Sequence, residues 1–197
     1  MPASSTGART TVVVVTWRGH GLIGRCLGAL VAQTRPHQLL VIDNASTDGT
    51  AGEIAEHRCR ALRMTSNVGY AGALAAALPL VDTPFMAWLN DDAQPEPGWL
   101  AALEQALDED ATAAAAASVL HAGDGAVIST GVVLTRIGYG ADSTGTAPFG
   151  FCGGAALLRT EVLRAAGGVP EELFCYYEDT DTSWRLRLAG YRVRAVP

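Results

Sequence analysis

Short apolar runs alternate with amphipathic segments in the first half of the chain. Residues 11–16 form a continuous, mostly β-branched run, which is typical of a strand buried on both faces of a parallel sheet. Residues 21–33 follow with apolar side chains at intervals of three and four, which predicts an amphipathic helix. An apolar run at 39–42 predicts the second strand, and the small polar residues at 44–48 are able to cap a helix that extends to about His57.

The same alternation continues with a predicted strand at 61–64, an Ala-rich helix at 69–78 and a strand at 84–89. Strands that are joined through helices run parallel with right-handed crossovers. The first half of the chain therefore predicts an α/β fold with a mostly parallel, Rossmann-like sheet.

The pattern changes after Trp99. A helix to about residue 108 is followed by apolar stretches at 113–120 and 127–134, and then by Gly/Ser/Thr-rich sequence to Gly150. We expect a smaller mixed-sheet region with a mobile loop.

The last segments are short and regular. Residues 157–166 and 179–189 predict two helices, and residues 191–196 predict a strand. Because the chain stops at Pro197, directly after that strand, we expect it to be a fragment.

Composition narrows the class of protein. A hydrophobic content of 49% with 17% charged residues is typical of a compact globular domain. The net charge is −6 and the 14 Lys and Arg residues are scattered, which excludes nucleic acid as an expected partner. The four cysteines form no CxxC pair, so we expect free thiols in the cytoplasm.

The sequence also limits its expected relation to membranes. It shows neither a secretory signal nor a stretch of about 18 apolar residues that would span a membrane. These two absences do not argue against peripheral contact with a membrane.

Polar residues follow the predicted strands at their carboxyl ends, where open α/β sheets bind ligands. Asp43 and Asn44 lead into Ser46 and Asp48, whose side chains are able to bind the edge of a nucleotide base, and the helix start nearby favours a diphosphate. Taken alone, the same residues are typical of a tight turn with a helix cap.

Asn90-Asp91-Asp92 follows the apolar strand and places two carboxylates together. Neighbouring anions repel each other unless a cation binds between them. Mg²⁺ and Mn²⁺ prefer oxygen ligands and are commonly shared between one or two carboxylates and substrate phosphates. The pair predicts such a metal site, although an isolated Asp-Asp pair is also typical of a solvated turn.

Glu178, Asp179 and Asp181 lie at the start of a predicted helix. A carboxylate there is able to accept a proton from an acceptor hydroxyl, and Asp179 is the residue we assign to that role. The alternative is that these acids only complement the helix dipole.

Two glycine-containing segments precede predicted elements. Gly153 and Gly154 would allow a ligand to approach the backbone, or would form a bulge in a strand. Asn67 is able to cap the Ala-rich helix, while Gly69 and Gly72 allow close packing or ligand approach.

Four segments in this order resemble the inverting family 2 glycosyltransferases over nearly the whole chain. They are Val-Ile-Asp-Asn-Ala-Ser-Thr-Asp-Gly-Thr, Asn-Val-Gly-Tyr-Ala-Gly, Leu-Asn-Asp-Asp and Tyr-Glu-Asp-Thr-Asp-Thr-Ser-Trp-Arg. Within the family the chain is most similar to the bacterial rhamnosyltransferase-like group, which builds cell-wall or surface polysaccharides on a GT-A fold.

The resemblance implies a division of the chain. Residues 1–10 would be a flexible tail, and residues 11–197 a single GT-A domain. Residues 11–92 would then form its nucleotide-binding half, and residues 93–197 its acceptor and catalytic half.

The resemblance also implies roles for single residues in the first half. Thr16 and Asp43 would contact the base and ribose, and Asn67 and Gly69 would line the donor pocket. Asp92 would bind Mg²⁺ or Mn²⁺.

Further roles are implied by the same resemblance. Asp91 would support the donor sugar or its phosphates, and Gly153 and Gly154 would lie near the sugar-phosphate. Asp179 would be the base.

The neighbours of that base complete the implied set. Glu178 and Asp181 would be its acidic neighbours, and Arg185 would orient this acidic group.

By resemblance, the donor is a UDP-, dTDP- or GDP-linked sugar and the acceptor a carbohydrate or a lipid-linked molecule, in the cytoplasm or at the inner face of the membrane. The cation would bridge the two phosphates while Asp179 deprotonates the acceptor hydroxyl, so that one displacement inverts the anomeric centre.

The sequence departs from the family pattern in two ways. Ala76 replaces a residue that is polar in many relatives, and no histidine follows Asp179, where relatives often supply a late metal ligand. We expect the missing ligand beyond Pro197, the alternative being an incomplete metal site.

Two other functions remain as alternatives. One is a non-catalytic sugar-nucleotide-binding or scaffolding domain. The other is a nucleotidyltransferase, whose usual Gly-rich phosphate loop is only faintly imitated by residues 17–21.

Overall fold

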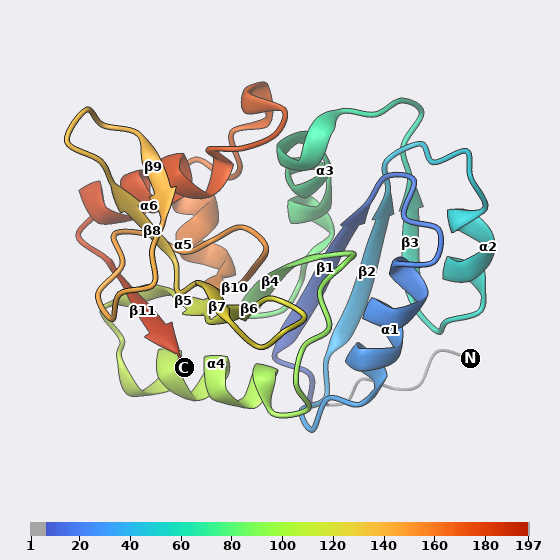
Figure 1. The fold of residues 1–197 in the computed structure, drawn as a ribbon, viewed down its shortest axis with the longest axis horizontal. Coiled ribbons are helices and arrows are strands. Elements are labelled where there is room, and N and C mark those ends of the chain that lie inside the picture. The colour runs from blue at the N-terminus through green and yellow to red at the C-terminus, as the bar shows by residue number, and fades with distance from the viewer. Residues whose placement is uncertain (1–6, 197) are drawn as a thin grey trace.

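The computed structural model describes residues 7–196, which form a three-layer α/β/α sandwich around a seven-stranded sheet (Figure 1). Its strands are β1 (Thr10–Thr16), β2 (Gln38–Asp43), β3 (Arg60–Arg63), β4 (Phe85–Asn90), β5 (Ala113–Ser118), β10 (Ala155–Arg159) and β11 (Arg192–Val196). They lie in the order β11-β5-β10-β4-β1-β2-β3. All neighbouring pairs are parallel except those of β10, which runs antiparallel between β4 and β5. The predicted α/β sheet is confirmed.

Strand β1 shows why the sheet forms here. Val12 and Val14 pack into the hydrophobic core on one face of the sheet, and Val13 and Val15 into the core on the other. Successive side chains of a strand point to opposite faces, so only a continuous apolar run serves a strand that is covered on both sides.

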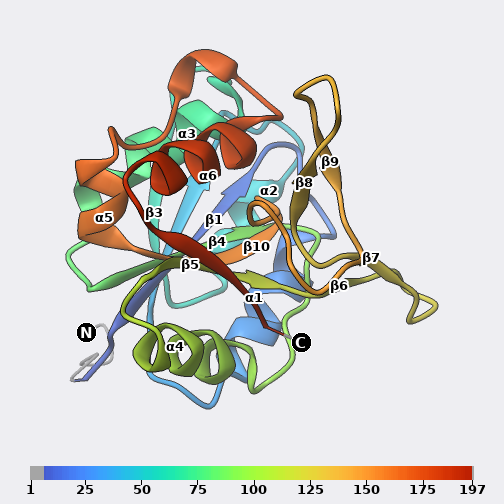
Figure 2. The same ribbon diagram turned by 90° about the vertical axis from the view of Figure 1, so that its left-hand side faces the viewer.

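Helices cover both faces of the sheet (Figure 2). One face packs against α3 (Gly69–Ala77), α5 (Thr160–Ala165) and α6 (Glu178–Leu188), and the other against α1 (Ile23–Val31), α2 (Thr50–Ala55) and α4 (Trp99–Glu109). Two short 3₁₀ helices are η1 (Leu78–Leu80) and η2 (Glu171–Leu173). No helix within residues 7–196 is long and apolar enough to cross a bilayer.

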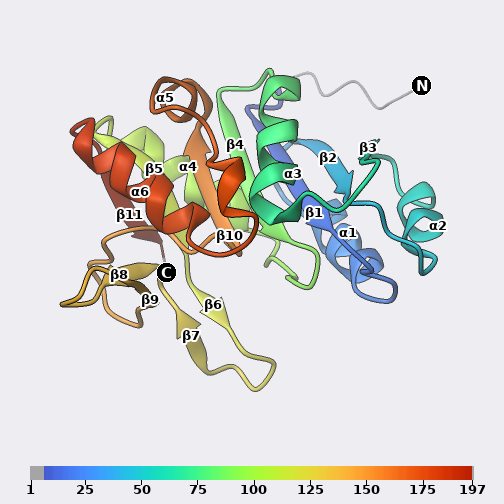
Figure 3. The same ribbon diagram turned by 90° about the horizontal axis from the view of Figure 1, so that it is seen from above.

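Two β-hairpins connect β5 to β10 and project from the sandwich (Figure 3). They consist of β6 (Leu120–His121) with β7 (Val127–Ser129), and β8 (Val132–Leu134) with β9 (Gly140–Asp142). Gly131, with φ +131°, separates β7 from β8, so the apolar stretch at 127–134 forms two strands. The Gly/Ser/Thr-rich sequence expected to be a mobile loop supplies β9.

The helix predicted at 157–166 is wrong in its first three residues. Leu157 is fully buried in β10, where it lies between Ala87 of β4 and Ala116 of β5. Helix α5 begins only at Thr160, whose N–H donates to the carbonyl of Pro84. Pairing with two neighbouring strands overrides the local helical pattern.

The first residues of the folded domain lie earlier than expected. Thr10, assigned to the tail, is fully buried as the first residue of β1 and donates a hydrogen bond to Glu104. Arg9 forms an ion pair with Asp108 at 2.7 Å. The expected flexibility of residues 1–6 lies outside the described residues.

Candidate active site

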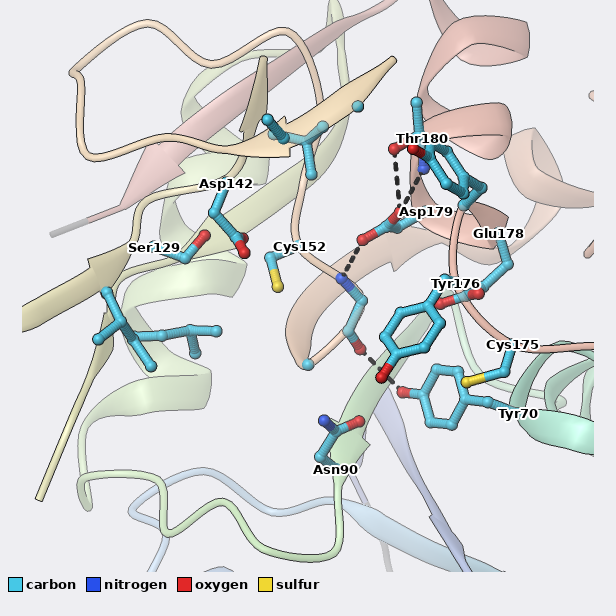
Figure 4. A pocket seen from close by; sticks show the side chains of 18 residues that line it. Tyr70, Asn90, Ser129, Asp142, Cys152, Cys175, Tyr176, Glu178, Asp179 and Thr180 are labelled. Atoms are coloured by element: carbon cyan, nitrogen blue, oxygen red, sulfur yellow. Dashed lines mark hydrogen bonds between the residues drawn. The ribbon is translucent and has the colours of Figure 1, made fainter. Parts of the chain in front are cut away.

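A cavity of about 620 Å³ lies at the sheet edge where β4 ends (Figure 4). Its walls come from the end of β4, the turn before β10, the start of α6, the two hairpins and Tyr70 of α3. Segments far apart in the sequence therefore meet at the edge where α/β sheets bind ligands.

Asp179 is held in place by backbone donors at this cavity. Its Oδ2 accepts the N–H of Gly153 at 2.9 Å, and its Oδ1 accepts the N–H of Thr180 at 2.5 Å. Asp179 is partly exposed and lines the cavity. A carboxylate that is fixed in this way and open to a ligand is suited to accept a proton.

Glu178 is a buried acid beside Asp179. It is only 5% exposed, and within the described part of the chain its Oε2 has no hydrogen-bond partner. Burial is the main cause that raises the pKa of Glu178 from 4.5 to about 7; the negative charge of Asp179 contributes to this shift, and backbone hydrogen bonds oppose it. Below about pH 7, Glu178 is therefore uncharged next to its neighbour.

The raised pKa of Glu178 makes stability depend on pH. Ionising the Glu178 carboxyl costs extra free energy in the folded state but not in the unfolded state. The loss of stability is therefore absent below about pH 4.5, grows as the pH rises to about 7, and stays constant above that pH. We expect the free energy of unfolding of the wild type to fall by about 3 kcal/mol relative to Glu178→Gln between pH 4.5 and pH 8. Urea unfolding at both pH values measures this difference. Glu172→Gln, at an exposed acid, should keep the wild-type dependence, and equal pH profiles for Glu178→Gln and the wild type would contradict the assignment.

Tyr70 joins α3 to the turn before β10. Its hydroxyl donates to the carbonyl of Gly153 at 2.8 Å. Burial, followed by the negative charges of Glu178, Asp179 and Asp91 among others, holds the pKa of Tyr70 well above 10. Tyr70 was not singled out from the sequence, although it lies within the quoted Asn-Val-Gly-Tyr-Ala-Gly segment.

Thr16 and Asp91 meet at the ends of neighbouring parallel strands. The hydroxyl of Thr16 donates to Oδ2 of Asp91 at 2.5 Å. Burial raises the pKa of Asp91, and the charge of Asp92 adds to the shift. This concentration of negative charge fits a cation.

The donor set at this edge fits a divalent metal only in part. Asp92 is exposed and so open to a ligand, and its carboxylate oxygens are of the kind that Mg²⁺ and Mn²⁺ prefer. Across residues 7–196, however, no group of three or more His, Cys, Asp or Glu side chains is placed to hold a metal. A cation here would need further oxygen ligands, and substrate phosphates are the usual source.

The acids of β4 lie beside the cavity, whose lining includes Asn90 but neither Asp91 nor Asp92. The N–H of Asn90 donates to the carbonyl of Gly154 at 3.0 Å, which joins β4 to the turn before β10. Glu178 and Asp179 line the cavity while Asp91 and Asp92 lie next to it, so a single cleft shared by these acids stays a prediction.

Asp43 is buried at the end of β2, with an exposure of 3%. Its Oδ1 accepts the N–H of Ser46 at 2.8 Å, and its Oδ2 accepts Nη1 of Arg63 at 3.1 Å. These bonds fix the turn after β2. A contact between Asp43 and a nucleotide base stays a prediction.

Asn67 and Gly69 form a turn that is bound to β2 through Asn44. The amide of Asn44 donates to Oδ1 of Asn67 at 2.8 Å and to the carbonyl of Gly69 at 3.0 Å. Gly69 has φ +79°, and a Cβ there would collide with the carbonyl of Phe174. Close packing is therefore the reason for this glycine, and a role of either residue in donor binding stays a prediction.

Gly153 and Gly154 lie in the turn before β10 and both line the cavity. A Cβ at Gly153 would lie 3.1 Å from Oε1 of Glu178 and 3.5 Å from Cβ of Asp179. The absence of a side chain allows α6 to approach this turn. The alternative of a bulge within the strand is not what the structure shows.

Asp181 does not line the cavity, unlike Glu178 and Asp179. Its Oδ2 accepts Nε of Arg185 at 2.7 Å, and this arginine also donates to the carbonyls of Ala166 and Gly168. Asp181 and Arg185 thus tie α6 to the end of α5. A catalytic role for Asp181 is not supported by this position.

Comparison with known proteins supplies the family. The model of the family described as "Glycosyl transferase family 2" matches residues 11–167. The chain is 28% identical to an N-acetylglucosaminyl-diphospho-decaprenol L-rhamnosyltransferase of Mycobacterium tuberculosis, over 94% of this chain and 73% of that protein.

Solved structures support the fold. The chain is similar to the mannosyltransferase PcManGT of Pyrobaculum calidifontis, in complex with GDP-Man and Mn²⁺, with a TM-score of 0.75 and 24% identity over 96% of this chain. It is also similar to TarS 1-349 of S. aureus in complex with UDP-GlcNAc, with a TM-score of 0.74 and 19% identity over 94% of this chain. The chain spans 55% of the length of each of these two proteins.

The fold is of the GT-A type, that of nucleotide-diphospho-sugar transferases. The chain belongs to glycosyl transferase family 2.

Proposed function

We propose that this chain is the catalytic part of a metal-dependent inverting glycosyltransferase, which moves a sugar from a nucleotide diphosphate to an acceptor hydroxyl. The observation that carries the proposal is Asp179, fixed by two backbone N–H groups in a cavity beside the acids that follow β4. Family membership and the rhamnosyltransferase relative support a role in cell-wall or surface polysaccharide synthesis.

In the proposed mechanism, Asp179 takes the proton from the acceptor hydroxyl as that hydroxyl attacks the anomeric carbon. The hydrogen bonds from Gly153 and Thr180 orient its carboxylate. Glu178, uncharged below about pH 7, does not add a second negative charge at the same place. A single displacement of this kind inverts the anomeric centre and needs no nucleophile from the protein.

Asp92 would hold Mg²⁺ or Mn²⁺, with Asp91 beside it and the diphosphate completing the ligands. The bound cation would neutralise charge on the leaving nucleotide. Thr16 orients the carboxylate of Asp91 through its hydrogen bond. The Mn²⁺ complex of the mannosyltransferase neighbour supports this assignment.

The donor would be a UDP-, dTDP- or GDP-linked sugar and the acceptor a carbohydrate or a lipid-linked molecule. Nucleotide sugars bound to the structural neighbours, and the lipid-linked acceptor in the name of the curated relative, support these classes. We place the reaction in the cytoplasm, at the inner face of the membrane where the acceptor is lipid-linked.

Thermal unfolding with a panel of nucleotide sugars tests the proposal. A ligand that binds only the folded state raises the Tm, by an amount that grows with its concentration above the Kd. We expect one UDP-, dTDP- or GDP-sugar to raise the Tm in the presence of Mn²⁺ and to lose most of that effect with EDTA. A panel in which no nucleotide sugar changes the Tm at saturating Mn²⁺ would refute the proposal.

A further inference from the structure

We propose that the cavity binds the acceptor as an uncharged sugar ring, with Tyr176 as the surface on which the ring stacks and Asp142 as the contact that selects hydroxyls over anionic groups. This inference rests on the proposed function and adds the substrate class of the same site. Neither residue was singled out from the sequence.

Tyr176 presents an unused aromatic surface to the cavity. It lines the cavity, yet it is 79% exposed. Its φ of +69° lies in the left-handed region, as does the φ of +68° of Tyr177, and bulky residues rarely adopt this conformation. Such strain persists only where the surrounding structure enforces it, and it is commonly found at functional sites.

The turn that carries Tyr176 is fixed by its contacts with α3. The carbonyl of Phe174 accepts the N–H of Ala71 at 3.0 Å, and Gly69 leaves room for this close approach. The turn thus holds the aromatic side chain at the mouth of the cavity. A tyrosine face is suited to the apolar C–H face of a pyranose, and its hydroxyl to the polar edge.

The opposite wall comes from the hairpins. Figure 4 shows Asp142 and Ser129 on one side of the cavity, and Tyr176, Glu178 and Asp179 on the other. Gly140 packs against the side chain of Thr180, so that β9 lies alongside the start of α6. Asp142, exposed at the end of β9, is therefore placed to accept hydrogen bonds from sugar hydroxyls.

The charge of the lining selects what enters. Among the described residues, the cavity is lined by the carboxyl groups of Asp142, Glu178 and Asp179 and by no Lys, Arg or His. A phosphate or uronate group would find acidic side chains and no basic one in this lining, which disfavours it. Leu120, Ile128 and Val132 add apolar surface suited to the carbon atoms of a neutral sugar.

Ligand-observed NMR titration with two methyl glycosides tests the inference. Methyl glucoside and methyl glucuronide differ in one group, a hydroxymethyl against a carboxylate. We expect the full chain to bind the neutral glycoside about tenfold more tightly than the glucuronide. Asp142→Asn should bring the ratio of the two Kd values closer to one.

Variants of Tyr176 test the stacking surface. Tyr176→Ala should weaken binding of methyl glucoside about tenfold, and Tyr176→Phe should retain most of it because the ring face is kept. Tyr139→Ala is the matched control. Like Tyr176, Tyr139 is an exposed tyrosine, but it lies on the hairpin β8–β9 and does not line the cavity.

The outcomes separate this inference from the proposed function. Equal affinity for the two glycosides, or an unchanged affinity in Tyr176→Ala, would overturn the inference while the Mn²⁺-dependent response to a nucleotide sugar still stands. Loss of that response in the wild type would instead refute the proposed function.

Discussion

Asp179→Asn is expected to lower the rate of sugar transfer by about 10²–10⁴-fold, the usual contribution of a general base. Asparagine is close to aspartate in size but cannot take a proton from the acceptor hydroxyl at neutral pH. The donor contacts proposed for Asp92 and its neighbours remain, so the donor Kd should stay close to the wild-type value. Mass spectrometry of the product and calorimetric titration of the donor measure the two quantities.

The design of this test must separate chemistry from folding. Both oxygens of Asp179 accept backbone N–H groups, and an amide leaves one of these donors without its acceptor. The Tm of Asp179→Asn is therefore measured alongside its activity. Glu172→Gln is the control, because it makes the same chemical change at an exposed acid outside the cavity. Transfer within twofold of the wild type by a folded Asp179→Asn would show that another group is the base.

Asp92→Ala is expected to weaken donor binding in the presence of Mn²⁺ by more than about tenfold, since even indirect support of a metal is commonly worth this much. Without Mn²⁺, the variant should bind the donor no more weakly than the wild type does, because the lost metal ligand is then not in use. Isothermal calorimetry with and without Mn²⁺ measures both values.

A control with the same change of charge completes the comparison. Glu56→Ala removes one exposed carboxylate from the end of α2, and it should leave the Mn²⁺-dependent affinity as it is. An unchanged donor Kd of Asp92→Ala at saturating Mn²⁺ would show that Asp92 is not the metal ligand.

The sheet was predictable because its central strands are short, continuous apolar runs in the sequence. The run at β1 and the strand before Asn90 are apolar on both faces, and strands of that kind pair in parallel at the centre of an α/β sheet. The boundary between β10 and α5 was not predictable. The apolar residues at 155–158 suit a helix equally well, and only pairing with β4 and β5, far away in sequence, decides between the two.

The candidate site was predictable only where the sheet defines it. Thr16 ends β1 and Asp91 directly follows the neighbouring parallel strand β4, so topology brings them together. Asp142 gave no signal, because its place depends on how the hairpin β8–β9 packs against α6. Tyr176 directly precedes Tyr177, the first residue of the quoted acidic segment, and this second aromatic residue was a usable signal.

The segment between β5 and β10 is structurally separate from the central sheet. Residues 120–150 leave one strand of the central sheet and return at its neighbour. Their four short strands pair as two hairpins, and Val132 of β8 also forms a bridge with Gly150 of the same segment. Exchanging this segment for that of a relative changes one wall of the cavity without altering the register of the sheet. Under the proposed function, such an exchange would change the preference for the acceptor while Thr16, Asp91 and Asp179 keep their places.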